Sequence, residues 1–345
     1  MRVFLAIVVA VLAIGTQTAQ AATGIEYGLT DDAWLTDGPG DVDARVTTLQ
    51  DLGVKVVRYT LRWDQIATAE PASPTDPTDP AYDWSTVTPV LDSLHTHDID
   101  VILQLYGAPT WANGGKPPNY MPTTSATFGA FATAAADEFP WVKKWVIWNE
   151  PNQLRWLRPT SPALYVTRLL NPAYAAIHKA ISGVMVAGGG TAPRGSTGGV
   201  SPVSWIETMH RTGARLDAYA HNPYPLDPKH ETPVSGGCTH CTTITMATLS
   251  KLVDLVAKDW PHARIWLTEY GYQTNPPDTF YGVSWAKQAL YLKEAFGIAR
   301  QNPRIDLMLW FLLRDDPNLN GWQSGLMTIG GKKKPAFTAF QNLFR

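Results

Sequence analysis

Eight short apolar segments alternate with helical segments along the chain, and this alternation predicts a single-domain α/β fold, the (β/α)8 TIM barrel. Two further observations agree with it. The length of 345 residues suits eight β/α units with insertions, and carboxylates stand where several apolar segments end. A doubly wound open sheet is the competing arrangement, but residues 26–31 lack the Gly-x-Gly-x-x-Gly fingerprint that normally follows its first strand.

Each predicted strand is a short, mainly apolar run, as expected for a parallel strand buried on both faces. The predicted strands are 24–29, 54–59, 100–106, 145–148, 184–188, 216–221, 264–268 and 305–311. The predicted helices lie between and after them, at 41–52, 82–97, 125–139, 161–183, 201–211, 246–259, 284–301 and 335–344.

Capping and turn residues mark several boundaries. Gly53 is expected to end helix 41–52, and Ser125 to begin the helix that follows the Gly- and Pro-rich loop 110–122. The Pro-rich segment 70–83 is expected to be a surface loop. Helix 161–183 should break near Asn171-Pro172, because proline removes a helical hydrogen bond.

The first residues have the features of a targeting segment. Arg2 precedes an apolar run over 3–14, and small and polar residues then lead to Ala19-Gln20-Ala21. The run is shorter than the ~20 residues needed to cross a membrane, which favours secretion over a retained anchor. We expect residues 1–21 to be a secretory signal peptide and residues 22–345 to form the barrel domain, secreted, monomeric and free of the membrane.

Composition narrows the class of partner. The formal net charge is −2 and no basic stripe is present, so we expect no nucleic-acid partner. Fourteen Trp provide flat apolar faces that suit sugar rings, although they suit an ordinary core equally well. We expect no cofactor.

Both cysteines lie close together, at Cys238 and Cys241. In a secreted chain a local disulfide is the favoured interpretation, and its small loop predicts a small entropic contribution. A metal site that adds His230 and His240 is the alternative, although no second Cys pair completes it.

Three of the eight glutamates, Glu26, Glu150 and Glu269, are expected at strand ends, since the first strand, within residues 24–29, is expected to end near Glu26. Glu150 follows the fourth strand and Glu269 the seventh, so in a closed ring of eight they face each other across the mouth. Two carboxylates on either side of a bond are what glycoside hydrolysis requires, one as acid and one as nucleophile or base.

The residues around this pair resemble a known group of enzymes. Asn149-Glu150-Pro151 resembles the Asn-Glu-Pro signature of clan A retaining glycoside hydrolases, and the longer run 148–152 is most similar to family 39 and to cellulase-like family 5 relatives. Arg58, the segment 221–224, Glu269 and Trp310 follow in the corresponding order over nearly the whole mature chain. The resemblance implies retaining cleavage of a β-glycosidic bond, with Glu150 as acid/base and Glu269 as nucleophile.

The chemistry gives the two carboxylates opposite needs. Burial, with Trp148 as a neighbour, is expected to raise the pKa of Glu150, while Arg58 and the Tyr224 hydroxyl stabilise charged Glu269. Asn149 would bind the sugar 2-hydroxyl. Retention requires the carboxyl groups to lie ~5–5.5 Å apart.

Two local expectations follow. Strict alternation would turn Asn149 away from Glu150, so the strand must end or bulge at Asn149. In the family the peptide bond after the Trp of strand eight is usually cis, which implies a cis bond at Trp310-Phe311.

Further residues at strand ends are candidates for binding substrate. The aromatic rings could instead be loop packing, Glu26 could pair with Arg58, and His221 could be an ordinary buried histidine. These candidates are Glu26, Tyr106, Trp111, His221, Trp310 and Trp322.

The motifs of several other enzyme classes are absent from the sequence. The chain has no Gly-x-Ser-x-Gly elbow and no His-Glu-x-x-His zinc motif, and no lysine follows a strand end where a Schiff base would need it. A catalytically silent glycan-binding barrel and a transglycosylase with the same residues remain as alternatives. The sugar, its linkage and the choice between internal and terminal cleavage stay open.

Overall fold

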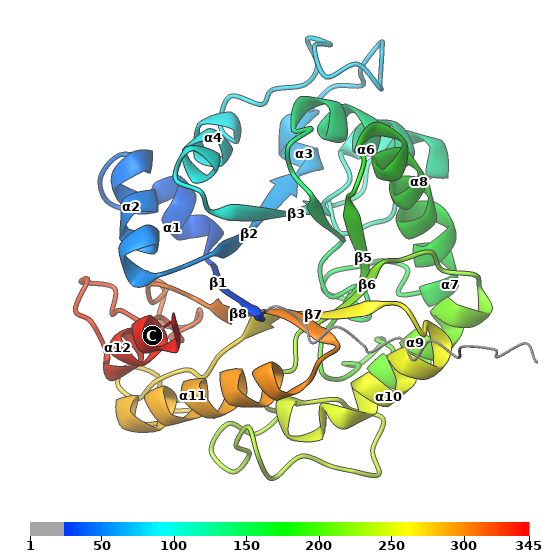
Figure 1. Cartoon of the computed structure of the whole chain (residues 1–345). Coiled ribbons are helices and arrows are strands. Elements are labelled where there is room, and N and C mark those ends of the chain that lie inside the picture. Colours follow the sequence, from blue (N-terminus) through cyan, green and yellow to red (C-terminus); the bar gives the residue numbers. More distant parts are fainter. Residues whose placement is uncertain (1–23, 345) are drawn as a thin grey trace, which may run out of the picture.

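The computed structural model describes residues 24–344, and the predicted signal peptide lies outside them. Eight parallel strands, each hydrogen-bonded to its sequence neighbours, close into a barrel in the order β1 to β8. Figure 1 shows the helices arranged around the outside of this ring. The TIM barrel prediction is confirmed.

The strands are β1 (Glu26–Thr30), β2 (Val56–Arg62), β3 (Asp100–Tyr106), β4 (Lys144–Ile147), β5 (Met185–Thr191), β6 (Ala218–His221), β7 (Arg264–Tyr270) and β8 (Ile305–Phe311). The helices are α1 (Asp32–Asp37), α2 (Val42–Leu52), α3 (Trp63–Ile66), α4 (Thr88–Thr96), α5 (Thr110–Asn113), α6 (Ser125–Glu138), α7 (Pro162–Tyr165), the π-helix η1 (Val166–Leu170), α8 (Asn171–Ala180), α9 (Pro202–Arg211), the 3₁₀ turn η2 (Met246–Thr248), α10 (Ser250–Asp259), α11 (Trp285–Gln301), α12 (Pro335–Gln341) and the 3₁₀ turn η3 (Asn342–Phe344). No helix within residues 24–344 has both the length and the apolar character of a membrane span.

Several boundaries differ from the predicted ones. Thr124, rather than Ser125, caps α6 with its side chain, and α4 starts at Thr88 because the residues before it form turns. The predicted break near Asn171 does not occur: α7, η1 and α8 follow one another without interruption, and only the π-helical turn η1 departs from α-helical geometry just before Asn171. Helices α1, α3 and α5 are short and had no periodic signal. Gly53 ends α2 in the left-handed conformation, as predicted.

Alternation along the strands divides the core in two. The inward side chains form a small cluster in which one large ring, Trp266, lies among alanines and aliphatic residues. Its other members are Val56, Ile102, Val146, Ala187, Ala218, Ala220, Leu307 and Leu309. The outward side chains pack against the helices in a much larger core. Which of two adjacent residues faces the barrel axis is therefore decided by register.

Glu26 lies at the wrong end of the barrel to bind substrate, so this prediction is wrong. It begins β1 instead of ending it, and its Oε2 accepts a hydrogen bond from Lys144 Nζ at 3.0 Å. Lys144 begins β4 and also pairs with Asp100, at the start of β3. The three charges therefore belong to the amino-terminal end of the barrel, away from the sites that TIM barrels build at the other end.

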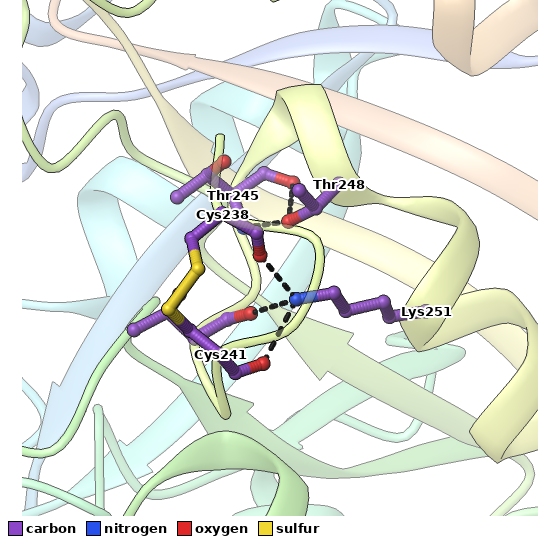
Figure 2. Close-up of a disulfide and its surroundings, with 6 residues drawn as sticks. Cys238, Cys241, Thr245, Thr248 and Lys251 are labelled. Carbon is purple, nitrogen blue, oxygen red and sulfur yellow. Dashed lines mark hydrogen bonds between the residues drawn. A yellow bond between two sulfur atoms is a disulfide. The ribbon is translucent and has the colours of Figure 1, made fainter. Parts of the chain in front are cut away.

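The long loop after β6 carries the cysteine pair. Cys238 and Cys241 are joined by a disulfide, with 5.5 Å between their Cα atoms (Figure 2). Lys251 of α10 points into the turn and donates to the carbonyl oxygens of Cys238, Cys241 and Thr243, the last two at 2.9 and 3.1 Å. No cluster of metal-binding side chains occurs among the described residues, so the structure gives the alternative metal site no support.

Candidate active site

A cavity of about 1020 Å³ opens at the carboxyl ends of the strands. Each of the eight strands, or the loop after it, contributes at least one lining residue: Asp32, Arg58, Tyr106, Glu150, Ala192, Tyr224, Glu269 and Phe311. Both predicted catalytic glutamates therefore lie in the same cavity.

Glu150 reaches the cavity because β4 stops early. The strand ends at Ile147, and Trp148 takes a left-handed backbone conformation with φ +70°. Its ring is buried in the outer core, where the Nε1 group donates to the Trp156 carbonyl at 2.7 Å. Asn149 and Glu150 then both line the cavity, as the predicted break in the strand requires, although the break falls one residue earlier.

The backbone of Glu150 is also left-handed, with φ +36°. Its amide donates to the carbonyl of Gly190, which lies in an irregular stretch of β5. Left-handed conformations are unfavourable by roughly 1–2 kcal/mol for residues that carry a Cβ. Two of them within three residues are typical of a functional site held in place by its surroundings.

Glu269 reaches the cavity because β7 contains an extra residue relative to β8. Along β7 three residue steps separate Leu267 from Tyr270, while their partners on β8, Met308 and Trp310, are two steps apart. The extra residue is a bulge, and it turns Glu269 into the cavity while Tyr270 stays in the outer core.

Two groups hold the Glu269 carboxylate. Arg58 Nη2 donates to Oε1 at 2.6 Å, and the Tyr224 hydroxyl donates to Oε2 at 3.0 Å. The Arg58 and Glu269 side chains are only 5% and 10% exposed, so solvent screens the pair weakly. Each carboxylate oxygen therefore accepts a hydrogen bond from the surrounding protein.

Asn222 links Glu150 to Thr268, the residue before Glu269, and was not among the predicted site residues. Its Nδ2 donates to Glu150 Oε1 at 3.2 Å, while its Oδ1 accepts from the Thr268 hydroxyl at 2.8 Å. The second bond fixes which end of the amide faces Glu150. Period-two alternation from the inward Ala218 and Ala220 would have pointed to Asn222.

His221, which was predicted to bind substrate, faces the other way, so this prediction is wrong. It is fully buried between strands, where Nε2 donates to the Ile244 carbonyl at 3.0 Å and Nδ1 accepts from the Thr191 hydroxyl at 2.8 Å. Burial lowers its pKa to about 4, so the ring is neutral. His221 ties β5 and β6 to the long loop and does not line the cavity.

The electrostatics of Glu150 differ from those of Glu269. Burial, and then the negative charge of Glu269, raise the pKa of Glu150 to about 7. Hydrogen bonds from the Asn222 amide and the Trp156 ring N–H, and the charge of Arg58, act in the opposite direction. Trp148 is not the neighbour responsible, because its ring points away from the cavity.

Asp32 is a third carboxylate of this cavity, and it was missed because it follows β1 inside a short helix. Burial raises its pKa, and the nearby Arg58 opposes that effect. The Thr60 amide donates to its Oδ1 at 3.3 Å.

The aromatic candidates fall into two groups. Tyr106 and Trp322 line the cavity, as does Trp156. Trp111 is only partly buried, but it packs edge-on against Trp63 and donates its ring N–H to the Ala67 carbonyl at 2.8 Å, and it is not part of the lining.

Trp310 is fully buried in the outer core, where its ring N–H donates to the Ser324 carbonyl, so its predicted contact with substrate is wrong. The next residue, Phe311, shares the inward register of Leu307 and Leu309 and lines the cavity. The non-proline cis peptide is Phe311-Leu312, so the predicted position at Trp310-Phe311 is also wrong by one residue.

Solved structures of similar fold include glycosidases. A family 39 glycoside hydrolase from Bacteroides cellulosilyticus WH2 superposes with a TM-score of 0.68 at 17% identity, covering 92% of this chain and 63% of that one. A monomeric beta-xylosidase from Caulobacter crescentus CB15 gives 0.65 at 18% identity, covering 93% and 67%. Xylanase 10B from Thermotoga maritima gives 0.62 at 13% identity, covering 93% and 94%.

The chain thus spans less than two thirds of the length of the Bacteroides enzyme. At these identities the superpositions establish the fold alone. No protein with a curated description matches the sequence.

The closed barrel and the carboxylates at its mouth agree with the class of clan A glycoside hydrolases. Residues 14–235 match the family model of Cellulase (glycosyl hydrolase family 5), and the chain belongs to that family.

Proposed function

We propose that the protein hydrolyses a β-glycosidic bond with retention of configuration, using Glu150 as acid/base and Glu269 as nucleophile. The observation that carries this proposal is the unlike environment of two carboxylates in one cavity. Glu150 has a pKa near 7 and holds its proton, whereas Glu269 is bound by Arg58 and Tyr224. A proton donor and a charged nucleophile are the two groups that double displacement needs.

In the first step Glu150 gives its proton to the oxygen of the leaving group, while a Glu269 oxygen forms a bond to the anomeric carbon. In the second step the Glu150 carboxylate takes a proton from water, and that water displaces Glu269 from the sugar. Glu269 is an uncharged ester between the steps. Its repulsion of the Glu150 carboxylate is then absent, so the pKa of Glu150 falls and suits its second role as a base.

Asn149 supports the glycone side of this scheme. Its Oδ1 is buried and has no hydrogen-bond partner among the described residues, although it lines the cavity. An unpaired buried oxygen is unfavourable unless a ligand group satisfies it. A sugar 2-hydroxyl next to the anomeric carbon is the donor that we assign to it.

The cavity has room for more than one sugar ring. Its volume of about 1020 Å³ lies at the top of the ~300–1,000 Å³ range of ordinary small-molecule sites. We therefore propose an oligosaccharide or a polysaccharide segment as substrate.

The test is turnover of a panel of aryl glycosides and β-glycans, with proton NMR of the first anomer released. We expect the β-anomer first, and strong loss of activity in Glu150→Gln and Glu269→Gln but not in Glu207→Gln, a helix variant outside the cavity. Release of the α-anomer would indicate inversion and carboxyl groups ~6.5–9.5 Å apart. Binding without turnover would identify a silent glycan-binding barrel, and transfer to added alcohols in preference to water a transglycosylase.

We further propose that residues 1–21 direct secretion and that the mature chain is a monomer. N-terminal sequencing of secreted protein and light scattering test these two points. Retention of the intact segment, or a mass of twice the chain, would contradict them.

A further inference from the structure

The charged side chains of the cavity are divided between two sides. Asp32 and Asp37 come from α1, directly after β1. Arg155 and Arg194 come from the loops after β4 and β5. The cavity is therefore acidic beside β1 and basic beyond Glu150.

Arg155 and Arg194 differ from the other two arginines of the cavity, which are paired with carboxylates. Arg58 is paired with Glu269, and Arg62 makes two hydrogen bonds to Asp64, at 2.8 and 2.7 Å. Arg155 and Arg194 form no ion pair with any acidic residue between positions 24 and 344. Their guanidinium groups are thus available to a ligand.

Arg194 is held next to the acid/base by its backbone. Its carbonyl oxygen accepts from the side-chain amides of Asn152, at 3.2 Å, and of Gln153. These two residues directly follow Glu150-Pro151, and Asn152 also bonds to Ala192 and to Val200 of the same loop. The position of Arg194 in the wall is therefore fixed relative to Glu150.

The indole ring of Trp156 lies between Arg155 and the carboxyl group of Glu150. Its guanidinium carbon is 5.3 Å from the centre of the Trp156 ring, and the ring N–H of Trp156 bonds to Glu150. Stacking on an aromatic face orients a guanidinium group and leaves its edge donors free. Both arginines thus border the region beyond the proton donor.

We propose that the sugar on the leaving-group side carries a carboxylate, so that the substrate contains a uronic acid residue next to the cleaved bond. This inference rests on the proposed function, because Glu150 protonates the leaving oxygen and so marks that side. Guanidinium groups match a carboxylate with two parallel hydrogen bonds. On the opposite side Asp32 and Asp37 would repel the same group, so the glycone is neutral.

The test compares matched substrates. Oligosaccharides that contain uronic acids and β-glycosidic bonds, derived from xylan and glycosaminoglycans, are used as isolated and after reduction of their carboxyl groups to hydroxymethyl groups. Cleavage is measured by kcat/KM, and binding by calorimetry with Glu150→Gln, so that affinity is read without turnover. The variants are Arg155→Gln with Arg194→Gln, and the control is Arg215→Gln, which removes an arginine stacked on Tyr174 outside the cavity.

We expect an acidic oligosaccharide to be bound and cleaved in preference to its reduced form. This preference should fall about tenfold in the double variant, the loss expected for charged hydrogen bonds, and should persist in the control. It should also weaken as salt rises, because the arginines are exposed. Equal or better use of the reduced forms, or no binding of any acidic oligosaccharide, overturns the inference. Cleavage of neutral glycans with retention would leave the proposed function intact in that case.

Discussion

The pKa of Glu150 predicts how the stability of the protein depends on pH. An acid whose pKa is higher in the folded state binds its proton more tightly there, so folding becomes less favourable once that proton is lost. The rise of the pKa from 4.5 to about 7 corresponds to a loss of about 3 kcal/mol of unfolding free energy, at ~1.36 kcal/mol per pH unit. This loss is absent below pH 4.5, grows as the pH rises to 7, and is constant above it.

Glu150→Gln should remove this dependence. Glutamine keeps the oxygen that accepts from Asn222 but carries no charge to desolvate or to set against Glu269. The variant should match the wild type at pH 4 and exceed its unfolding free energy at pH 8 by up to about 3 kcal/mol, less where solvent in the cavity screens the charge.

The measurement is urea unfolding at pH 4, 6 and 8, with Glu207→Gln as the control for a glutamate outside the cavity. In a Glu269→Gln background the gain at pH 8 should be smaller, because the second cause of the raised pKa has been removed. A difference between Glu150→Gln and wild type that is the same at every pH would refute the reasoning.

Three further substitutions test two aromatic residues of the cavity and one buried ion pair. Tyr224→Phe removes one hydrogen bond to Glu269 and should lower kcat by about tenfold to a hundredfold, with thermal stability little changed. Trp322 is 39% exposed, and its ring centre lies 5.0 Å from that of Tyr224. If it stacks on a sugar, Trp322→Ala should raise KM by about tenfold and lower kcat less. An unchanged KM would exclude that contact. Lys334→Met leaves Asp315 buried without its ion pair at 2.7 Å and should destabilise the fold by about 3–5 kcal/mol in urea unfolding, with part of the loss restored by adding Asp315→Asn.

The order of the elements could be predicted from the sequence because its signals are local. The run at 100–106 is apolar on both faces and coincides with β3, and the run at 305–311 coincides with β8. Gly53 ends a helix for a reason that acts on one residue, its freedom to take φ +87°. Short helices such as α3 have too few residues to show a period, and they were missed.

Predictions about single side chains failed where the role of a residue depends on which face of its strand the side chain occupies. His221 was preferred to its neighbour Asn222, which bonds to Glu150, and Trp310 to its neighbour Phe311, which lines the cavity. A residue at a strand end faces the axis or the helices according to register, and one step reverses the choice. Alternation from the small inward residues of β6 would have corrected the first case, whereas ring size alone favoured Trp310 in the second.

The barrel and the strands that carry Glu150 and Glu269 could be predicted from consecutive residues, because apolar runs and the position of a charge after them are local properties. The entry of both side chains into one cavity could not be predicted in this way. That outcome depends on a left-handed turn at Trp148 and a bulge before Tyr270, each defined by hydrogen bonds to a neighbouring strand. The grouping of Arg155 and Arg194 beyond the acid also depends on contacts between loops distant in sequence, which no local pattern encodes.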